Sequence, residues 1–218
     1  MGSNFESVLL VGDARKGGTQ QLTEELADWL RPQVRQVQLC LDREQPLEEV
    51  EADLVVVLGG DGSLLSAARR MGANQRPTLG INLGRLGFLT AYGRDETHEA
   101  LAAALRGELV EDTRCLLSCS WRSGHGEDGW SAPVLALNDA VLHRNSKAPM
   151  LTLEAHRDGV PLGRYHGDGL IVATAVGSTA YSMGAGGPVL DPSLNAVLLT
   201  PLASHSLAVR PLVAPIGG

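Results

Sequence analysis

The feature of the sequence best suited to chemistry is a group of glycines around one aspartate, Gly59-Gly60-Asp61-Gly62-Ser63. It follows five apolar residues, 54–58 (LVVVL), which predict a strand buried on both faces of a parallel sheet. The glycines lack the Cβ atoms that would keep a ligand off the backbone, and Ser63 can cap the helix expected to follow. Free amides and a helix N-terminus aimed at one point attract phosphate, so the stretch predicts a phosphate site with the Asp61 carboxylate inside it. The competing interpretation is an ordinary turn, because glycine and aspartate populate turns for conformational reasons alone.

A second candidate site lies in residues 168–188, DGLIVATAVGSTAYSMGAGGP. The apolar run 169–176 predicts a strand, which leads into a turn that carries Ser178, Thr179, Tyr181 and Ser182 among small residues. Small residues let a flat ring approach the backbone, while hydroxyls and free amides supply the polar contacts that orient it. The same stretch is compatible with a glycine-rich β-turn that holds a half-buried tyrosine.

Four further positions are open to two interpretations each. Asn138 and Asp139 form either a polar break inside a predicted strand, or an amide and a carboxylate that grip the two hydroxyls of a ribose. His205 is either a ligand contact or a hydrogen-bonded, partly buried histidine. Arg210 is either a phosphate contact or one half of a surface ion pair. The local sequence alone leaves these alternatives open.

The elements that must position these residues change in type halfway along the chain. In residues 1–110, predicted strands near 7–11, 34–41, 54–58 and 77–81 alternate with predicted helices near 20–30, 63–71 and 97–106. This alternation favours an α/β domain with a parallel sheet. In residues 111–218, short apolar runs are separated by Gly, Asp, Asn and Pro, and Asp158-Gly159 is a hairpin turn signal. The sequence therefore predicts an α/β domain, 1–110, followed by an all-β domain, 111–218.

Composition argues against several classes of protein. The chain has 218 residues, of which 44% are hydrophobic, enough for one large or two modest domains. A net charge of −7 and the lack of a basic run argue against nucleic acid as the main partner. No apolar run reaches the roughly 18 residues of a membrane span, and the N-terminus does not resemble a signal peptide. Cys40, Cys115 and Cys119 lack zinc-ligand spacing, so we expect a cytoplasmic protein with reduced thiols and no membrane partner.

Taken together and in this order, these stretches resemble the bacterial NAD kinase family over nearly the whole chain. The glycine–aspartate group is similar to the family's GGDGT-type loop, which is weakly specific because lipid kinases and phosphofructokinases carry it too. The later stretches GINLGRLGFLT (80–90), NDAVLH (138–143), DGLIVATAVGSTAYSMGAGGPV (168–189) and LLTPLASHSLAVRPLV (198–213) are similar to later family blocks, and GSTAYS with its downstream glycines is strongly specific. The resemblance implies an N-terminal α/β domain, a C-terminal β-sandwich domain and a site in the cleft between them.

The reaction that the resemblance implies is transfer of the γ-phosphoryl group of Mg-ATP to the 2′-hydroxyl of the adenosine ribose of NAD, giving NADP. Asp61 is then the catalytic base, Asn138 and Asp139 bind a ribose, and Asp168 lies near the second nucleoside. Magnesium enters with ATP, and no residue is assigned to a metal. The implied phosphate loop is Gly59, Gly60 and Ser63, and the implied nucleotide-binding set is Asp61, Gly62, Ser66, Asn138, Asp139, His166, Asp168, Thr179, Ala180, Tyr181, Ser182, Met183 and Gly184.

The chain departs from the family pattern in three places. The family usually has Glu where Asp139 stands, and its TPTGSTAY reads TAVGSTAY here, which loses a proline and, at Val176, a threonine hydroxyl. Family members also continue beyond the position of Gly218, so we expect a β domain that is incomplete at its C-terminus and a homo-oligomer, a dimer or a tetramer. The rival interpretations are a nucleotide-binding homologue with weak or no activity and another GGDG-loop kinase for a lipid or a sugar. The choice between ATP and polyphosphate, between NAD and NADH, and any allosteric control stay open.

Overall fold

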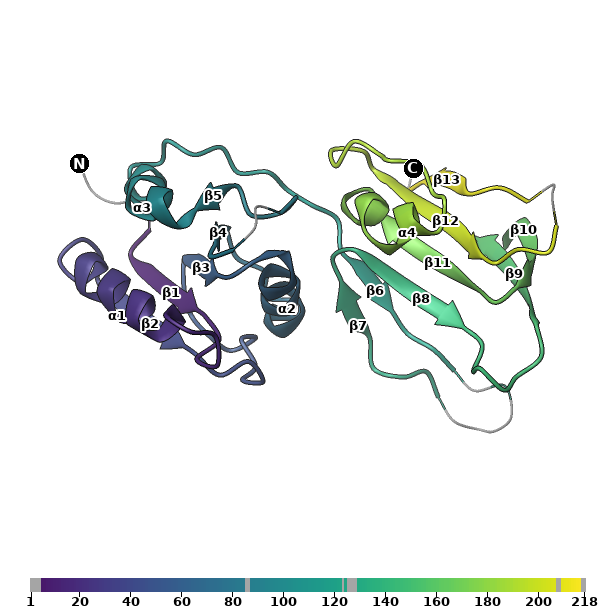
Figure 1. Cartoon of the computed structure of the whole chain (residues 1–218), viewed down its shortest axis with the longest axis horizontal. Helices are drawn as coiled ribbons and strands as arrows, with labels where there is room; N and C mark the ends of the chain where they lie inside the picture. The colour runs from purple at the N-terminus through teal and green to yellow at the C-terminus, as the bar shows by residue number, and fades with distance from the viewer. Residues whose placement is uncertain (1–4, 85–86, 123, 125–128, 207–208, 217–218) are drawn as a thin grey trace. The chain divides into compact units, whose positions relative to one another are not determined.

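The computed structural model describes residues 5–84, 87–122, 124, 129–206 and 209–216, and the chain forms two compact units, Met1–Asp112 and Thr113–Gly218 (Figure 1). Each unit has hydrophobic clusters of its own. Within the stretches singled out from the sequence, Arg85, Leu86, Leu207 and Ala208 lie outside the described residues.

The first unit is a parallel five-stranded sheet with helices on both faces. Its strand order is β2-β1-β3-β4-β5, and all neighbouring strands are parallel. The strands are β1 (Ser7–Val11), β2 (Gln36–Cys40), β3 (Leu54–Leu58), β4 (Thr78–Asn82) and β5 (Tyr92–Gly93). The helices are α1 (Thr19–Leu30), α2 (Asp61–Met71) and α3 (Thr97–Leu105), the last preceded by the 3-10 turn η1 (Arg94–Glu96).

The two faces of this sheet bury different helices. Side chains of a strand alternate between faces, so Val8 and Leu10 of β1 belong to one cluster, with residues of α1 and α3, while Leu9 and Val11 belong to the other, with residues of α2. All five residues of β3 are buried, as the apolar run predicted. The carboxyl ends of these parallel strands meet at one edge of the sheet, the edge at which open α/β sheets bind ligands.

The second unit is all-β with two short helical turns. Its main sheet is antiparallel in the order β13-β12-β11-β8, and two further strand pairs, β9–β10 and β6–β7, are also antiparallel. The strands are β6 (Leu117–Cys119), β7 (Val134–Ala136), β8 (Asp139–His143), β9 (Leu151–Arg157), β10 (Val160–Gly167), β11 (Gly169–Thr174), β12 (Ala196–Leu202) and β13 (Leu212–Pro215). After β11 come η2 (Val176–Thr179) and α4 (Tyr181–Gly184). The predicted fold class, α/β followed by all-β, is confirmed.

The turn between β9 and β10 is the one that its sequence signalled. Asp158 has φ of 52° and Gly159 has φ of 80°. Two successive residues with positive φ are what a two-residue type I′ hairpin requires, and Asp-Gly is a favoured pair for it. In the described part of the chain, no helix has both the length and the apolar character needed to cross a membrane.

Candidate active site

Asp61 is the first residue of α2, and the helix begins two residues earlier than the cap proposed from the sequence. The N-cap is Gly60, and the helix start has no side-chain cap, so the prediction that Ser63 caps α2 is wrong. Ser63 instead accepts a hydrogen bond from Lys16 Nζ at 3.2 Å. Gly59 has φ of 154°, and a Cβ there would overlap with the Ser63 side chain. A glycine at this position therefore lets the first turn of α2 pack against the end of β3.

Three donors from the loop after β4 hold the Asp61 carboxylate. The backbone N–H of Phe88 donates to Oδ2 at 2.8 Å, the N–H of Leu89 donates to Oδ1 at 3.1 Å, and the Thr90 hydroxyl donates to Oδ1 at 3.2 Å. A Cβ at Gly87 would overlap with the carboxylate, so the backbone passes directly against it. Asp61 is therefore more than a turn residue: its side chain is oriented by residues 27 to 29 positions away.

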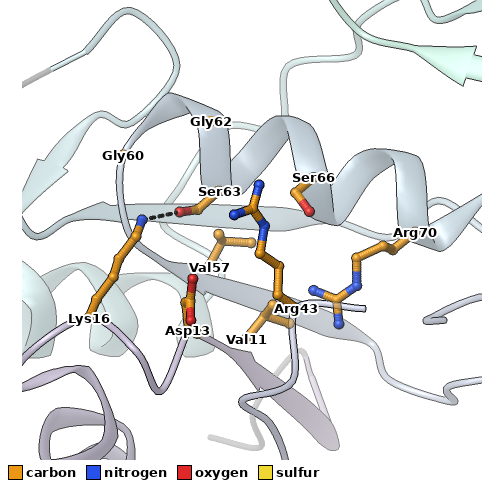
Figure 2. A pocket seen from close by; sticks show the side chains of 11 residues that line it. Val11, Asp13, Lys16, Arg43, Val57, Gly60, Gly62, Ser63, Ser66 and Arg70 are labelled. Atoms are coloured by element: carbon orange, nitrogen blue, oxygen red, sulfur yellow. Dashed lines mark hydrogen bonds between the residues drawn. The ribbon is translucent and has the colours of Figure 1, made fainter. Parts of the chain in front are cut away.

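A basic pocket of about 220 Å³ lies beside the start of α2, at the carboxyl ends of β1 and β3 (Figure 2). Lys16 approaches from one side and Arg43 and Arg70 from the other. Its acidic member, Asp13, is paired with Arg15 at 2.9 Å, and hydrogen bonds from Arg15 lower the pKa of Asp13 to about 2. The lining consists of Val11, Gly12, Asp13, Lys16, Arg43, Val57, Gly60, Gly62, Ser63, Ser66 and Arg70. Clustered cations and a helix N-terminus make the pocket suited to a polyanion.

Arg70 ties the loop that carries Arg43 to helix α2. Its Nε donates to the Gln45 carbonyl at 2.7 Å, and its Nη2 donates to the Asp42 carbonyl and to the Cys40 sulfur, each at 2.9 Å. These bonds hold residues 42–45 against α2, so that Arg43 stays beside the pocket.

In the second unit, the structure brings Asn138 and Asp139 to the turn after β11. The Asn138 carbonyl accepts from the Thr174 N–H at 2.8 Å, and the Tyr181 N–H donates to the Asp139 carboxylate. Asn138 Oδ1 is buried and has no hydrogen-bond partner among the described residues. Burial raises the pKa of Asp139, and the Tyr181 bond offsets this effect in part. The structure thus leaves one buried acceptor, Asn138 Oδ1, without a donor among the described residues, beside the partly buried Asp139 carboxylate.

We expect Gly177→Ala to disrupt this turn. A Cβ at Gly177 would overlap with the backbone of Asn138, which cannot move away as a flexible side chain could. Overpacking of this kind costs roughly 1–3 kcal/mol of unfolding free energy. The measurement is thermal unfolding of the variant beside Gly129→Ala, a control in the same unit, since nothing lies within 4 Å of a Cβ there. Equal melting temperatures for the two variants would contradict the close approach.

Two hydroxyls of the turn are buried and hydrogen-bonded within the fold, and the others are partly buried or exposed. Ser178 donates to the Ala175 carbonyl at 2.7 Å and accepts from the Leu190 N–H at 2.9 Å, and Ser182 is bonded to Thr200 at 2.7 Å; both serines are buried. Tyr181 is exposed. The partly buried Thr179 donates to the Val176 carbonyl at 3.3 Å. Of the remaining predicted contacts, Met183 and Gly184 are exposed and Ala180 is partly buried.

Asp168 precedes β11 at the end of that strand far from Asp139, and His166 lies two residues earlier, on β10. Asp139 pairs with Ala173 in the β8–β11 register, whereas Gly169, next to Asp168, pairs with His143. Asp168 is therefore five residues along the strand from the position that pairs with Asp139, a separation of about 17 Å at the usual rise per residue. Asp168 forms an ion pair with Arg144 at 2.7 Å, and the Thr152 hydroxyl lies 3.0 Å from His166 Nδ1. The structure therefore does not bring these two residues to the turn in one chain.

His205 and Arg210 flank the approach to β13. The His205 N–H donates to the His166 carbonyl at 3.0 Å, so the two histidines are neighbours through the backbone. Arg210 donates to the Val209 carbonyl at 3.0 Å.

Two family models match the chain. The ATP-NAD kinase N-terminal domain matches residues 42–109, and the ATP-NAD kinase C-terminal domain matches residues 137–216. The NAD kinase of Solibacter usitatus is 40% identical over 218 residues, an alignment that covers 94% of this chain and 74% of that protein. The chain belongs to the ATP-NAD kinase family. This confirms the predicted family and enzyme class, and it does not favour the rival interpretations.

Further relatives agree with this family assignment. The NAD kinase of Cupriavidus pinatubonensis is 39% identical, covering 97% of this chain and 72% of that protein. A crystal structure of yeast NADH kinase complexed with NADH superposes with a TM-score of 0.85 at 26% identity, covering 96% of this chain and 69% of that one. An NAD kinase from Archaeoglobus fulgidus in complex with ATP superposes with a TM-score of 0.74 at 33% identity, covering 96% and 77%.

Several residues of the site were missed by reasoning from the sequence. Lys16 and Arg43 lie in loops after β1 and β2, and Arg70 lies on α2. Thr90 lies within the stretch 80–90 that resembles the family, but its residue type and neighbours in the sequence indicate no role for it. The sequence did contain one signal for Lys16 and Arg43: each follows a predicted parallel strand, and loops after parallel strands converge at one edge of the sheet.

Proposed function

We propose that this chain transfers the γ-phosphoryl group of Mg-ATP to the 2′-hydroxyl of the adenosine ribose of NAD, giving NADP. The observation that carries the proposal is the Asp61 carboxylate, held by three donors at the N-terminus of a helix beside a cationic pocket. The two solved relatives contain NADH and ATP, which supports a nicotinamide nucleotide and ATP as the substrate classes.

The basic pocket is the proposed site for the phosphates of the donor. Lys16, Arg43 and Arg70 supply positive charge, and the amides of Gly60 and Gly62 lie at the positive end of the α2 dipole. Ser63 and Ser66 add hydroxyls on the pocket side of the helix. The divalent ion is part of the substrate Mg-ATP here. Among the described residues, no three His, Cys, Asp or Glu side chains are grouped to hold a metal.

The turn of the second unit is the proposed site for the acceptor nucleotide. The partly buried Asp139 carboxylate is an acceptor for one ribose hydroxyl, and the Asn138 side chain, whose Oδ1 is buried, would turn to offer a second. The exposed Tyr181 ring and the small residues from Thr179 to Gly184 are suited to contact with a flat base. Asp168 stays a predicted contact of the second nucleoside, and His166 stays a predicted nucleotide contact.

In the proposed reaction, Asp61 accepts the proton of the 2′-hydroxyl. The hydroxyl oxygen attacks the γ-phosphorus, the new P–O bond forms, and the bond to the β–γ bridging oxygen breaks as ADP leaves. Phosphoryl transfer asks the protein mainly to position the reactants and to neutralise charge. Lys16, Arg43 and Arg70 would supply the charge, and Asp61 the proton acceptor.

The decisive experiment incubates the purified chain with NAD and Mg-ATP and measures NADP. Parallel reactions replace ATP with polyphosphate, NAD with NADH, and NAD with lipid or sugar acceptors. NADP formation at a rate proportional to protein supports the proposal. Phosphorylation of only a lipid or a sugar, or nucleotide binding without turnover, would overturn it in favour of one of the two rivals.

We expect Arg43→Ala to raise the KM for ATP by about ten-fold and to leave the KM for NAD within about two-fold. A hydrogen bond to a charged group contributes roughly 1.5–3 kcal/mol, and this one would be made only to the donor. Steady-state kinetics with each substrate varied in turn measures the split. Arg35→Ala is the matched control, because Arg35 is an exposed arginine of the same unit outside this pocket. An unchanged KM for ATP would remove Arg43 from the donor site.

A cytoplasmic location and a homo-oligomeric state stay predictions. Size-exclusion chromatography with light scattering measures the second directly.

A further inference from the structure

A short chain of polar side chains leads from strand β4 to Asp61. Asn82, the last residue of β4, and Thr90 are buried, with 3% and 1% of their surfaces exposed. Asn82 Nδ2 lies 2.8 Å from Thr90 Oγ1, and Thr90 Oγ1 lies 3.2 Å from Asp61 Oδ1. The threonine hydroxyl thus links Asn82 to Asp61.

The chemistry of the three groups fixes the direction of both hydrogen bonds. Asn82 Oδ1 accepts the Gly84 N–H at 2.8 Å, so the amide nitrogen, which can only donate, faces Thr90. A hydroxyl has one proton, and an ionised carboxylate can only accept. The Thr90 proton is therefore directed at Asp61 Oδ1, while the Thr90 oxygen takes the amide proton of Asn82.

The donors around Asp61 are distributed unequally between its two oxygens. Among the described residues, Oδ1 accepts from the Leu89 N–H and the Thr90 hydroxyl, whereas Oδ2 accepts from the Phe88 N–H alone. A carboxylate has about four acceptor positions, two on each oxygen. Within the described part of the chain, three are filled, so one acceptor position remains, on Oδ2.

We propose that Thr90, oriented by Asn82, is a positioning residue that fills Oδ1 and so directs the acceptor hydroxyl to Oδ2 of Asp61. The inference rests on the proposed function, in which Asp61 is the base. Without the threonine hydroxyl, both oxygens have an open acceptor position and one restraint on rotation of the carboxylate is lost. The acceptor hydroxyl would then meet a base with two competing orientations, and fewer encounters would be aligned for transfer.

The test compares Thr90→Val with Thr90→Ser. Valine preserves the shape of threonine and removes the hydroxyl, so kcat should fall about ten-fold while the KM values for NAD and ATP stay within about two-fold. Serine restores the hydroxyl, and Thr90→Ser should keep at least about a third of the wild-type kcat. Thr97→Val is the matched control: Thr97 is an equally buried threonine of the same unit whose hydroxyl donates to the Arg94 carbonyl at 2.6 Å. It should lose thermal stability without the kcat effect.

A double-mutant cycle with Asp61→Asn separates the inference from the proposed function. If Thr90 acts through Asp61, Thr90→Val should change the residual rate of Asp61→Asn by less than about two-fold. Equal fold losses in both backgrounds, or a serine variant as slow as the valine variant, would overturn the positioning role. So would full activity of Thr90→Val combined with an inactive Asp61→Asn. Full activity of Asp61→Asn would instead refute the proposed function.

Discussion

Asp61→Asn is expected to lower kcat by about 10²–10⁴-fold, the usual contribution of a general base, while NAD binding changes by no more than a few-fold. The amide removes the charge and the proton acceptor. Each carboxylate oxygen accepts a backbone N–H from the loop after β4. The amide NH₂ group must replace one of these oxygens, and it then faces a second donor with no acceptor between them. A modest loss of stability should therefore accompany the loss of rate. Single-turnover kinetics and equilibrium NAD binding measure the two effects separately.

Asp53 provides the matched control for this variant. Its carboxylate also accepts two backbone N–H groups, of Glu6 and Ser7, and one hydroxyl, of Ser7. These bonds lower the pKa of Asp53, and it lies outside the proposed site. All three bonds reach one oxygen, Oδ2, whose place an amide oxygen can take, so Asp53→Asn should cost less stability than Asp61→Asn and leave kcat unchanged. If the two variants lose activity equally, or if Asp61→Asn keeps most of its kcat, Asp61 is not the base.

Asp139→Asn is expected to weaken NAD binding and to raise the melting temperature at neutral pH. A charge-assisted hydrogen bond to a ribose hydroxyl is worth roughly 1.5–3 kcal/mol, so the Kd for NAD should rise about ten-fold or more. The stability gain has a separate cause. Burial raises the pKa of Asp139, which means that folding disfavours its ionised form. An amide removes that unfavourable term and keeps a similar shape.

The pH dependence of this second effect has a definite sign. Because the folded-state pKa of Asp139 lies above the ordinary value of 3.8, the folded state holds this proton more tightly than the unfolded state. The contribution of Asp139 to stability is then fully present below pH 3.8 and is lost as the pH rises through the folded-state pKa. The melting temperature of Asp139→Asn should exceed that of the wild type at pH 7, and the difference should shrink on acidification. A less stable variant with unchanged NAD affinity would reduce Asp139 to a polar break in the strand.

Local patterns in the sequence were sufficient for the elements of the fold. The apolar run 54–58 became the fully buried β3, Asp158-Gly159 became a hairpin turn, and the alternation of strands and helices became a parallel sheet. These features depend on the spacing of residues within one element, so they can be predicted without knowing where that element lies in the fold. The same is true of the family resemblance, which rested on short contiguous stretches.

The tertiary structure alone decided how the candidate site is held. Nothing near Asp61 in the sequence indicates that its donors come from residues 88–90, or that Asn82 sets the direction of the Thr90 hydroxyl. Lys16 and Arg43 meet at one pocket because loops after different parallel strands converge at one edge of the sheet. Such contacts join residues far apart in the chain, so they arise only when packing has brought the strands and loops together.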